Sequence, residues 1–100
     1  MAYEVIWTLH AEEDYRQIIF YLKKEWSETV ALNFIKTTEE RIERIAVFPL
    51  LGVASEKDNS IRSIVITKHN KLYYQFLESK IYILSIFDTR QHPDKNKFEQ

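Results

Sequence analysis

The chain has 100 residues, of which 45% are hydrophobic, 14% aromatic and 29% charged, so it has the composition of one globular domain over residues 1–100 and not of a disordered chain. It contains no cysteine, which excludes disulfides and thiolate chemistry, and its net charge of −1 argues against a strongly basic nucleic-acid binder. We find no signal-peptide pattern and no apolar run near the roughly 20 residues of a membrane helix, so we expect a cytoplasmic protein without membrane contact.

The first part of the chain predicts a strand and a helix. Residues 3–7 are aromatic and β-branched, which favours a short strand. Thr8 can then cap a helix over about residues 10–25. The helix carries one apolar stripe at helical spacing, made of Tyr15, Ile18, Ile19, Leu22 and Trp26. We expect this stripe, together with Trp7, to face the core.

A second helix follows after a tight connection. Ser27 is its predicted cap, and Pro49 with the only glycine, Gly52, ends it. Its apolar stripe consists of Ala31, Phe34, Ile35, Thr38, Ile42 and Ile45. Two helices joined so closely form an antiparallel hairpin.

The C-terminal half predicts a polar loop over residues 53–60 and then a change of period to two. Three strand-like runs cover residues 61–67, 72–77 and 81–87. His69-Asn70 and Glu78-Ser79 separate these runs and are short enough for hairpin turns. The order β-α-α-β-β-β predicts a two-layer α+β domain, with the helical hairpin packed on a mainly antiparallel sheet.

A two-residue turn at His69-Asn70 would determine which side chains share a face of the sheet. In that register one face carries the opposing pairs Lys68 with Lys71, Ile66 with Tyr73, Ile64 with Gln75, and Arg62 with Leu77. The better core face holds Ile61, Val65, Leu72, Tyr74 and Phe76. Like charges directly opposite each other destabilise a sheet. Either the two lysines splay into water, or they bind a phosphate or a carboxylate.

Basic residues are concentrated in the same half of the chain. Residues 57–100 carry eight Lys or Arg and five Asp or Glu, whereas residues 1–56 carry six and ten. The excess is explained either by a solvated sheet surface or by a local site for an anionic partner. No metal site is expected, because His10, His69 and His92 lack ligand spacing. No cofactor is expected either, since a single glycine excludes a P-loop or dinucleotide fingerprint.

Motifs along residues 3–93 together resemble one known family. They are Val5-x-Trp7, Ala11-Glu12-x-Asp14-Tyr15-x-x-Ile18-x-x-Tyr21, Trp26, Ala31, Phe34, Arg41-Ile42-x-x-Ile45, Pro49-x-x-Gly52, Ile61-Arg62, Leu72-x-Tyr74, Ile83-Leu84-x-Ile86 and Asp88-x-Arg90-x-x-Pro93. Their order and spacing resemble the RelE/ParE superfamily of toxins from type II toxin–antitoxin systems. The resemblance implies a growth-inhibiting toxin that a cognate antitoxin wraps and neutralises in a hetero-oligomer.

The superfamily divides by mechanism. RelE-like members cut messenger RNA on the ribosome with basic side chains of the sheet face, whereas ParE-like members inhibit DNA gyrase and are not nucleases. Residues 11–21 and the Lys24-Glu25-Trp26 corner are more similar to the ParE-like branch. The resemblance therefore implies a gyrase inhibitor. The alternatives are a RelE-like ribosome-dependent endoribonuclease and a degenerate, non-toxic member that binds only its antitoxin.

The nuclease alternative implies a set of catalytic residues. They are Arg62, Lys71 and Arg90, with His92 as a weaker member. Cleavage by 2′-hydroxyl attack needs a base, an acid and cations, and only the histidine has an ordinary pKa suited to a base. Ile64 and Ile66 stand where ribosome-dependent nucleases carry further basic side chains, so the set is partial.

Overall fold

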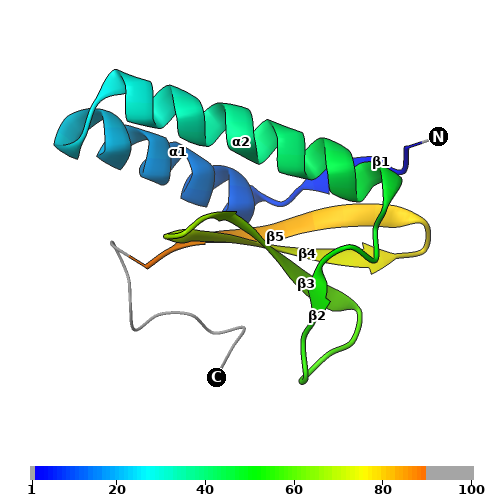
Figure 1. Cartoon of the computed structure of the whole chain (residues 1–100). Coiled ribbons are helices and arrows are strands. Elements are labelled where there is room, and N and C mark those ends of the chain that lie inside the picture. Colours follow the sequence, from blue (N-terminus) through cyan, green and yellow to red (C-terminus); the bar gives the residue numbers. More distant parts are fainter. Residues whose placement is uncertain (1, 90–100) are drawn as a thin grey trace.

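The computed structural model describes residues 2–89 and confirms the predicted two-layer α+β architecture (Figure 1). Its elements are β1 (Glu4–Trp7), α1 (Leu9–Glu25), α2 (Glu28–Val47), β2 (Val53–Ala54), β3 (Ile61–Thr67), β4 (Asn70–Leu77) and β5 (Lys80–Asp88). The sheet order is β1-β5-β4-β3-β2, with β1 parallel to β5 and the other neighbours antiparallel. The two helices lie side by side over one face of this sheet.

Both predicted helix caps are present. The Thr8 hydroxyl accepts a hydrogen bond from the Ala11 N–H at 3.1 Å, and the Ser27 hydroxyl accepts one from the Val30 N–H at 3.1 Å. Each cap satisfies an amide that the first helical turn would leave unpaired. The expectation for Trp26 was wrong, because its side chain is 56% exposed at the C-terminal end of α1.

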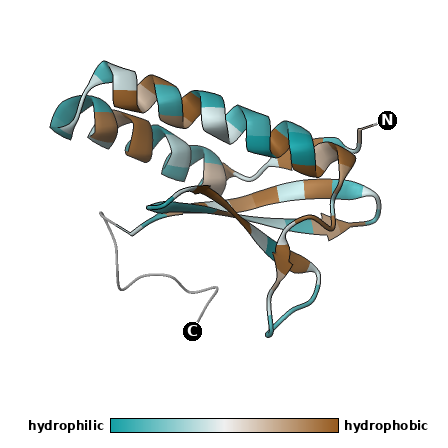
Figure 2. Cartoon of the chain, viewed as in Figure 1, coloured by the Kyte–Doolittle hydropathy of each residue, from teal (hydrophilic) through white to brown (hydrophobic). Residues whose placement is uncertain are grey.

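The core lies between the helical hairpin and the sheet face beneath it. Its buried members include Ile18 and Leu22 of α1, Phe34 and Ile45 of α2, and Leu72, Tyr74, Ile81, Ile83 and Ile86 of the sheet. Along both helices, hydrophobic and hydrophilic residues alternate in bands, as amphipathic helices on a sheet require (Figure 2). Neither described helix is long and apolar enough to cross a membrane.

The segment after α2 is more ordered than predicted. Residues 53–60 were expected to form a loop throughout, but Val53 and Ala54 form the short strand β2 and pair with Ser63 and Arg62. Two residues give too weak an alternation to be identified in a sequence. β2 therefore makes the outer edge of the sheet beside β3.

The turn between β3 and β4 also differs from the prediction. It consists of residues 68–69, and Asn70 is the first residue of β4, opposite Thr67. The Thr67 hydroxyl closes the turn, because it donates to Asn70 Oδ1 at 2.6 Å and accepts from the His69 N–H at 3.1 Å. The predicted turn at His69-Asn70 is therefore wrong by one residue.

A β-bulge between Val65 and Thr67 shifts the register further. The observed pairs are Ile61 with Gln75, Arg62 with Tyr74, Ser63 with Tyr73, Ile64 with Leu72, and Val65 with Lys71. Arg62 and Ile64 consequently share the helix-covered face with the buried Tyr74, while Val65 and Lys71 share the opposite face. The predicted faces were wrong for β3, and the predicted opposition of two lysines does not occur.

The turn of the second hairpin lies at Glu78-Ser79 as predicted, and its backbone conformation suggests a stabilising substitution. Glu78 and Ser79 form the β4–β5 turn with φ of 53° and 63°, the left-handed region that a type I′ turn needs and that Asn-Gly adopts with least strain. Replacing both (Glu78→Asn with Ser79→Gly) should raise the free energy of unfolding by about 1 kcal/mol, measured by urea unfolding. The same dipeptide placed at residues 68–69, where φ is not positive, should give no gain.

Candidate functional site

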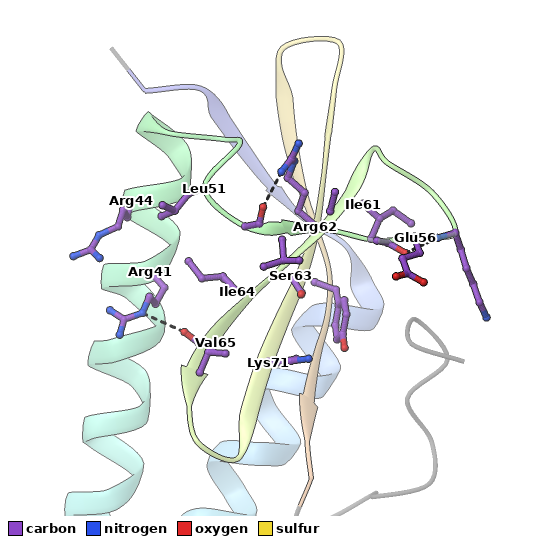
Figure 3. Close-up of a pocket in the computed structure, with 16 residues that line it drawn as sticks. Arg41, Arg44, Leu51, Glu56, Ile61, Arg62, Ser63, Ile64, Val65 and Lys71 are labelled. Carbon is purple, nitrogen blue, oxygen red and sulfur yellow. Dashed lines mark hydrogen bonds between the residues drawn. The ribbon is translucent and has the colours of Figure 1, made fainter.

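A groove runs between α2 and β3 and is closed at one end by the segment that leads into β2 (Figure 3). We call it the α2–β3 groove; its volume is about 690 Å³. Its charged lining residues are Arg41, Arg44, Lys57, Arg62 and Lys71, with Glu56 as the one acid. Such a lining attracts an anionic group of a partner, which agrees with the basic excess of residues 57–100.

The corner that follows α2 is held by the phenol of Tyr74. Its hydroxyl donates to the Pro49 carbonyl at 2.7 Å and accepts from the Gly52 N–H at 2.9 Å. The Tyr74 side chain is fully buried, and this burial raises the pKa of the phenol, whereas the Gly52 N–H and the Arg62 guanidinium act to lower it. The helix end is therefore fastened to the centre of β4.

Arg62 fastens the same corner from β3. Its guanidinium donates to the Gly52 carbonyl at 2.8 Å and to the Leu50 carbonyl at 3.2 Å. Figure 3 shows the Arg62 side chain directed to the end of the groove where this corner lies. Arg62 thus has a structural role here, because the orphan carbonyls of a helix end and turn need donors.

Because burial raises the pKa of Tyr74, we expect the free energy of unfolding to fall at alkaline pH. An unfolded chain ionises tyrosine near pH 10, whereas folded Tyr74 keeps its proton to higher pH. The stabilisation is therefore complete below about pH 10 and is lost as the pH rises through the folded pKa. Unfolding free energies measured from pH 8 to pH 11 should fall at the alkaline end. Tyr74→Phe should reduce that slope, and the residual slope should report Tyr15, whose pKa burial also raises.

The structure brings together only part of the predicted catalytic set. Arg62 and Lys71 both line the groove, but they lie on opposite faces of the β3–β4 hairpin and their side chains end in different places (Figure 3). Ile64 packs on the core and Ile66 is 4% exposed within it, so neither occupies the face of Lys71. Arg90 and His92 lie outside the described residues, and their predicted roles stay predictions.

Two groove residues come from α2 and were not predicted as site residues. Arg41 and Arg44 stand three residues apart, so they project from neighbouring positions on one side of the helix. The Arg41 Nε donates to the Val65 carbonyl at 3.2 Å and ties α2 to β3. Their positions flank the apolar stripe of α2, which is the signal that could have placed them beside the sheet edge.

The chemistry available in the groove is that of anion binding. Its described lining contains cations, one carboxylate and the hydroxyls of Ser55, Ser63 and Tyr73, but no histidine. Guanidinium groups remain protonated and serve as donors to carboxylate or phosphate, not as bases. No group of three metal-ligating side chains occurs among residues 2–89. The site therefore fits recognition of an acidic partner better than acid–base chemistry.

One family model matches most of the chain. Residues 5–93 match the family model described as ParE toxin of the type II toxin–antitoxin system parDE. No curated protein matches the sequence. Among solved structures, the chromosomal ParDE system of P. aeruginosa is similar with a TM-score of 0.72 and 16% identity, covering 87% of this chain and 96% of that one.

Two further solved structures place the fold in the same group. The YoeB dimer of Staphylococcus aureus is similar with a TM-score of 0.62 and 17% identity, over 87% of this chain and 97% of that one. A mutant of E. coli toxin RelE in the free state is similar with a TM-score of 0.64 and 14% identity, over 89% and 85%. Likeness at these identities establishes a shared fold.

Proposed function

Because this chain belongs to the ParE toxin family of type II toxin–antitoxin systems, we propose that it arrests growth by binding a protein target, DNA gyrase, and is neutralised by a cognate antitoxin. It acts in the cytoplasm, where gyrase is found, and it is not itself an enzyme. Antitoxin and toxin form a hetero-oligomer in which the toxin is held inactive.

This proposal is carried by the hydrogen bonds that Arg62 makes to the backbone. Its guanidinium already donates to the Gly52 and Leu50 carbonyls, so it is committed to the corner after α2. A nuclease would need this cation together with Lys71 around one phosphate, and the register places the two on opposite faces of the hairpin. The described part of the predicted nuclease set is therefore better explained by structure and binding than by catalysis.

The direct test uses purified toxin with purified gyrase. The expected result is loss of supercoiling of a relaxed plasmid, or trapping of cleaved DNA, with the antitoxin restoring normal activity. Unaltered supercoiling at saturating toxin would refute the gyrase target. Absence of any growth arrest on induction without antitoxin would instead favour the non-toxic alternative.

The RelE-like nuclease remains the second candidate function, since the groove carries Lys71 and the fold is shared with RelE. Lys71→Ala separates the two functions, because Lys71 lies on the sheet face that a nuclease would use. We expect this variant to arrest growth as wild type does, with intact transcripts by RNA sequencing. A nuclease would lose roughly 100-fold or more in cleavage, and growth would resume. Lys24→Ala, on the exposed end of α1, is the matched control.

A further inference from the structure

Another pocket lies where α1, α2 and the end of β1 meet, at the end of the helical hairpin where α1 begins (Figure 1). We call it the α1–α2 pocket; its volume is about 540 Å³. Among the described residues, it shares no lining residue with the α2–β3 groove. It is therefore a separate feature of the molecule, and its chemistry needs its own explanation.

One wall of the α1–α2 pocket is aromatic. The rings of Trp7 and Tyr15 contact each other, with centroids 5.1 Å apart and an interplanar angle of 43°, and Ile42 lines the same pocket. All three side chains are partly buried, because they pack against the core and also line the pocket. Aromatic rings that remain open to a pocket attract cations to their negative faces.

The rim of the pocket is acidic. On α1, Glu12 and Arg16 lie 3.8 Å apart, and Arg16 also pairs with Glu13 at 2.8 Å, so this cation is already used within its own helix. On α2, Glu39 and Glu43 have no ion-pair partner among residues 2–89. They stand four residues apart on one side of the helix, where like charges destabilise it. Two uncompensated carboxylates therefore border the aromatic wall.

These surroundings suit an organic cation. Burial raises the pKa of Tyr15, and the Glu39 carboxylate raises it further, which agrees with a carboxylate close to the aromatic wall. A metal ion fits less well, because no group of three metal-ligating side chains occurs in the described part of the chain. A guanidinium fits both features, since it is planar and weakly hydrated, stacks on aromatic rings and pairs with carboxylates.

We propose that the α1–α2 pocket binds an arginine side chain of the toxin's protein target. The guanidinium stacks on the rings of Trp7 and Tyr15. Its N–H groups pair with the carboxylates of Glu39 and Glu43. Charge complementarity favours a target that acts on DNA, because such an enzyme presents cations to the phosphate backbone, whereas residues 1–56 carry six Lys or Arg against ten Asp or Glu. The identity of the partner rests on the proposed function, whereas the site and its chemistry rest on the pocket.

The chemistry of the site is tested by titrating the probe N-acetylarginine amide into the wild-type protein. The NMR shift of the Trp7 indole N–H should saturate in the millimolar range, whereas that of Trp26, exposed at the other end of α1, should change little. N-acetylcitrulline amide has the same shape without the charge, and should bind at least about 10-fold more weakly. Tyr15→Leu removes one ring and should weaken binding of the arginine probe about 5-fold, and Tyr15→Phe, which keeps the ring, should weaken it less.

The role of the site is tested with Glu39→Gln combined with Glu43→Gln, which keeps the shape of both side chains and removes their charges. Half-inhibition of supercoiling by purified gyrase should need about 10-fold more of this variant than of wild type. Glu25→Gln with Glu28→Gln makes the same change of charge at the opposite end of the hairpin, and should act within about 3-fold of wild type. Thermal unfolding of every variant first establishes that each remains folded.

The outcomes separate the inference from the proposed function. Equal binding of the arginine and citrulline probes, or an equal loss of inhibition in the two double variants, overturns the inference and leaves gyrase inhibition intact. Binding of the arginine probe together with wild-type inhibition by Glu39→Gln with Glu43→Gln would assign the pocket to a free organic cation, and would likewise overturn it. If the wild-type protein fails to inhibit gyrase, the proposed function fails and with it the identity of the partner, while the probe titration still decides the site.

Discussion

Gly52→Ala is expected to lower the free energy of unfolding by about 3 kcal/mol, because the added methyl group has no room. A Cβ at this position would lie 2.7 Å from the Tyr74 hydroxyl and 2.8 Å from the Ser63 carbonyl. Neither neighbour moves easily, since Tyr74 is fully buried and the Ser63 carbonyl belongs to the β2–β3 pair. Relief of the contact would cost the hydrogen bond from the Gly52 N–H to Tyr74.

Differential scanning calorimetry should show this loss as a fall in Tm of roughly 15 °C. Tyr74→Phe provides the control, because it removes the oxygen that the new methyl group meets and costs only about 1 to 2 kcal/mol by itself. In that background Gly52→Ala should cost less than in wild type, which a double-mutant cycle measures as coupling. A Tm for Gly52→Ala close to that of wild type would show that the corner relaxes freely, contrary to this account.

Sequence periodicity was sufficient for the layers of this fold because they depend on averages over many residues. Apolar stripes at helical spacing along residues 10–45 and a period of two after residue 60 leave one reasonable arrangement, a helical hairpin on a sheet. The caps at Thr8 and Ser27 were predictable for a local reason, since each hydroxyl reaches an amide three residues later.

The register of β3 against β4 depends on single contacts, and these are not visible in a pattern. The hydroxyl of Thr67 closes the turn one residue earlier than predicted, and the bulge after Val65 adds an unpaired residue. Because side chains alternate along a strand, the combined shift of three positions moves residues 61–65 of β3 to the other face, whereas Thr67, which precedes the turn and pairs with Asn70, is shifted by two positions and keeps its face. Arg62 was therefore predicted on an open basic surface, whereas in the structure its guanidinium donates hydrogen bonds to the corner after α2.

The candidate site shows the same limit. Strand β3 was predictable from the period of two, and the basic residues Lys57, Arg62 and Lys71 from the charge distribution, but the position of the site beside α2 was not. Arg41 and Arg44 reach the groove because the helical hairpin packs with α2 beside β3. No local sequence pattern encodes this tertiary contact. Pro49, Gly52, Arg62 and Tyr74, which belong to the motifs of the resemblance, meet in one hydrogen-bonded corner, so in this chain they have a structural role.

Asp14→Ala is expected to lower the free energy of unfolding by about 2 to 3 kcal/mol, through the junction of α1 with β5. A bulge in the β4–β5 ladder occurs where Tyr73 pairs with Ser85 and Tyr74 with Ile83. The Asp14 carboxylate accepts from the Ser85 hydroxyl at 2.8 Å and from the Ile86 N–H at 3.0 Å beside this bulge. Without the carboxylate, the Ile86 N–H would have no acceptor in a half-buried place.

The predicted loss of stability is local to the contact between Asp14 and β5. Amide hydrogen exchange can therefore distinguish it from a loss of stability over the whole fold. Exchange of the Ile86 amide should accelerate in Asp14→Ala more than exchange of the amides in the β3–β4 hairpin. Asp14→Asn keeps an oxygen acceptor of the same shape and should recover part of the stability, whereas Ser85→Ala should cost about 1 kcal/mol, since only one hydrogen bond is removed. Equal stability of Asp14→Ala and wild type would mean that water replaces the carboxylate at the bulge. In that case α1 would be held to β5 by the shared apolar core and by Thr8, whose hydroxyl donates to the Ile83 carbonyl at 2.8 Å.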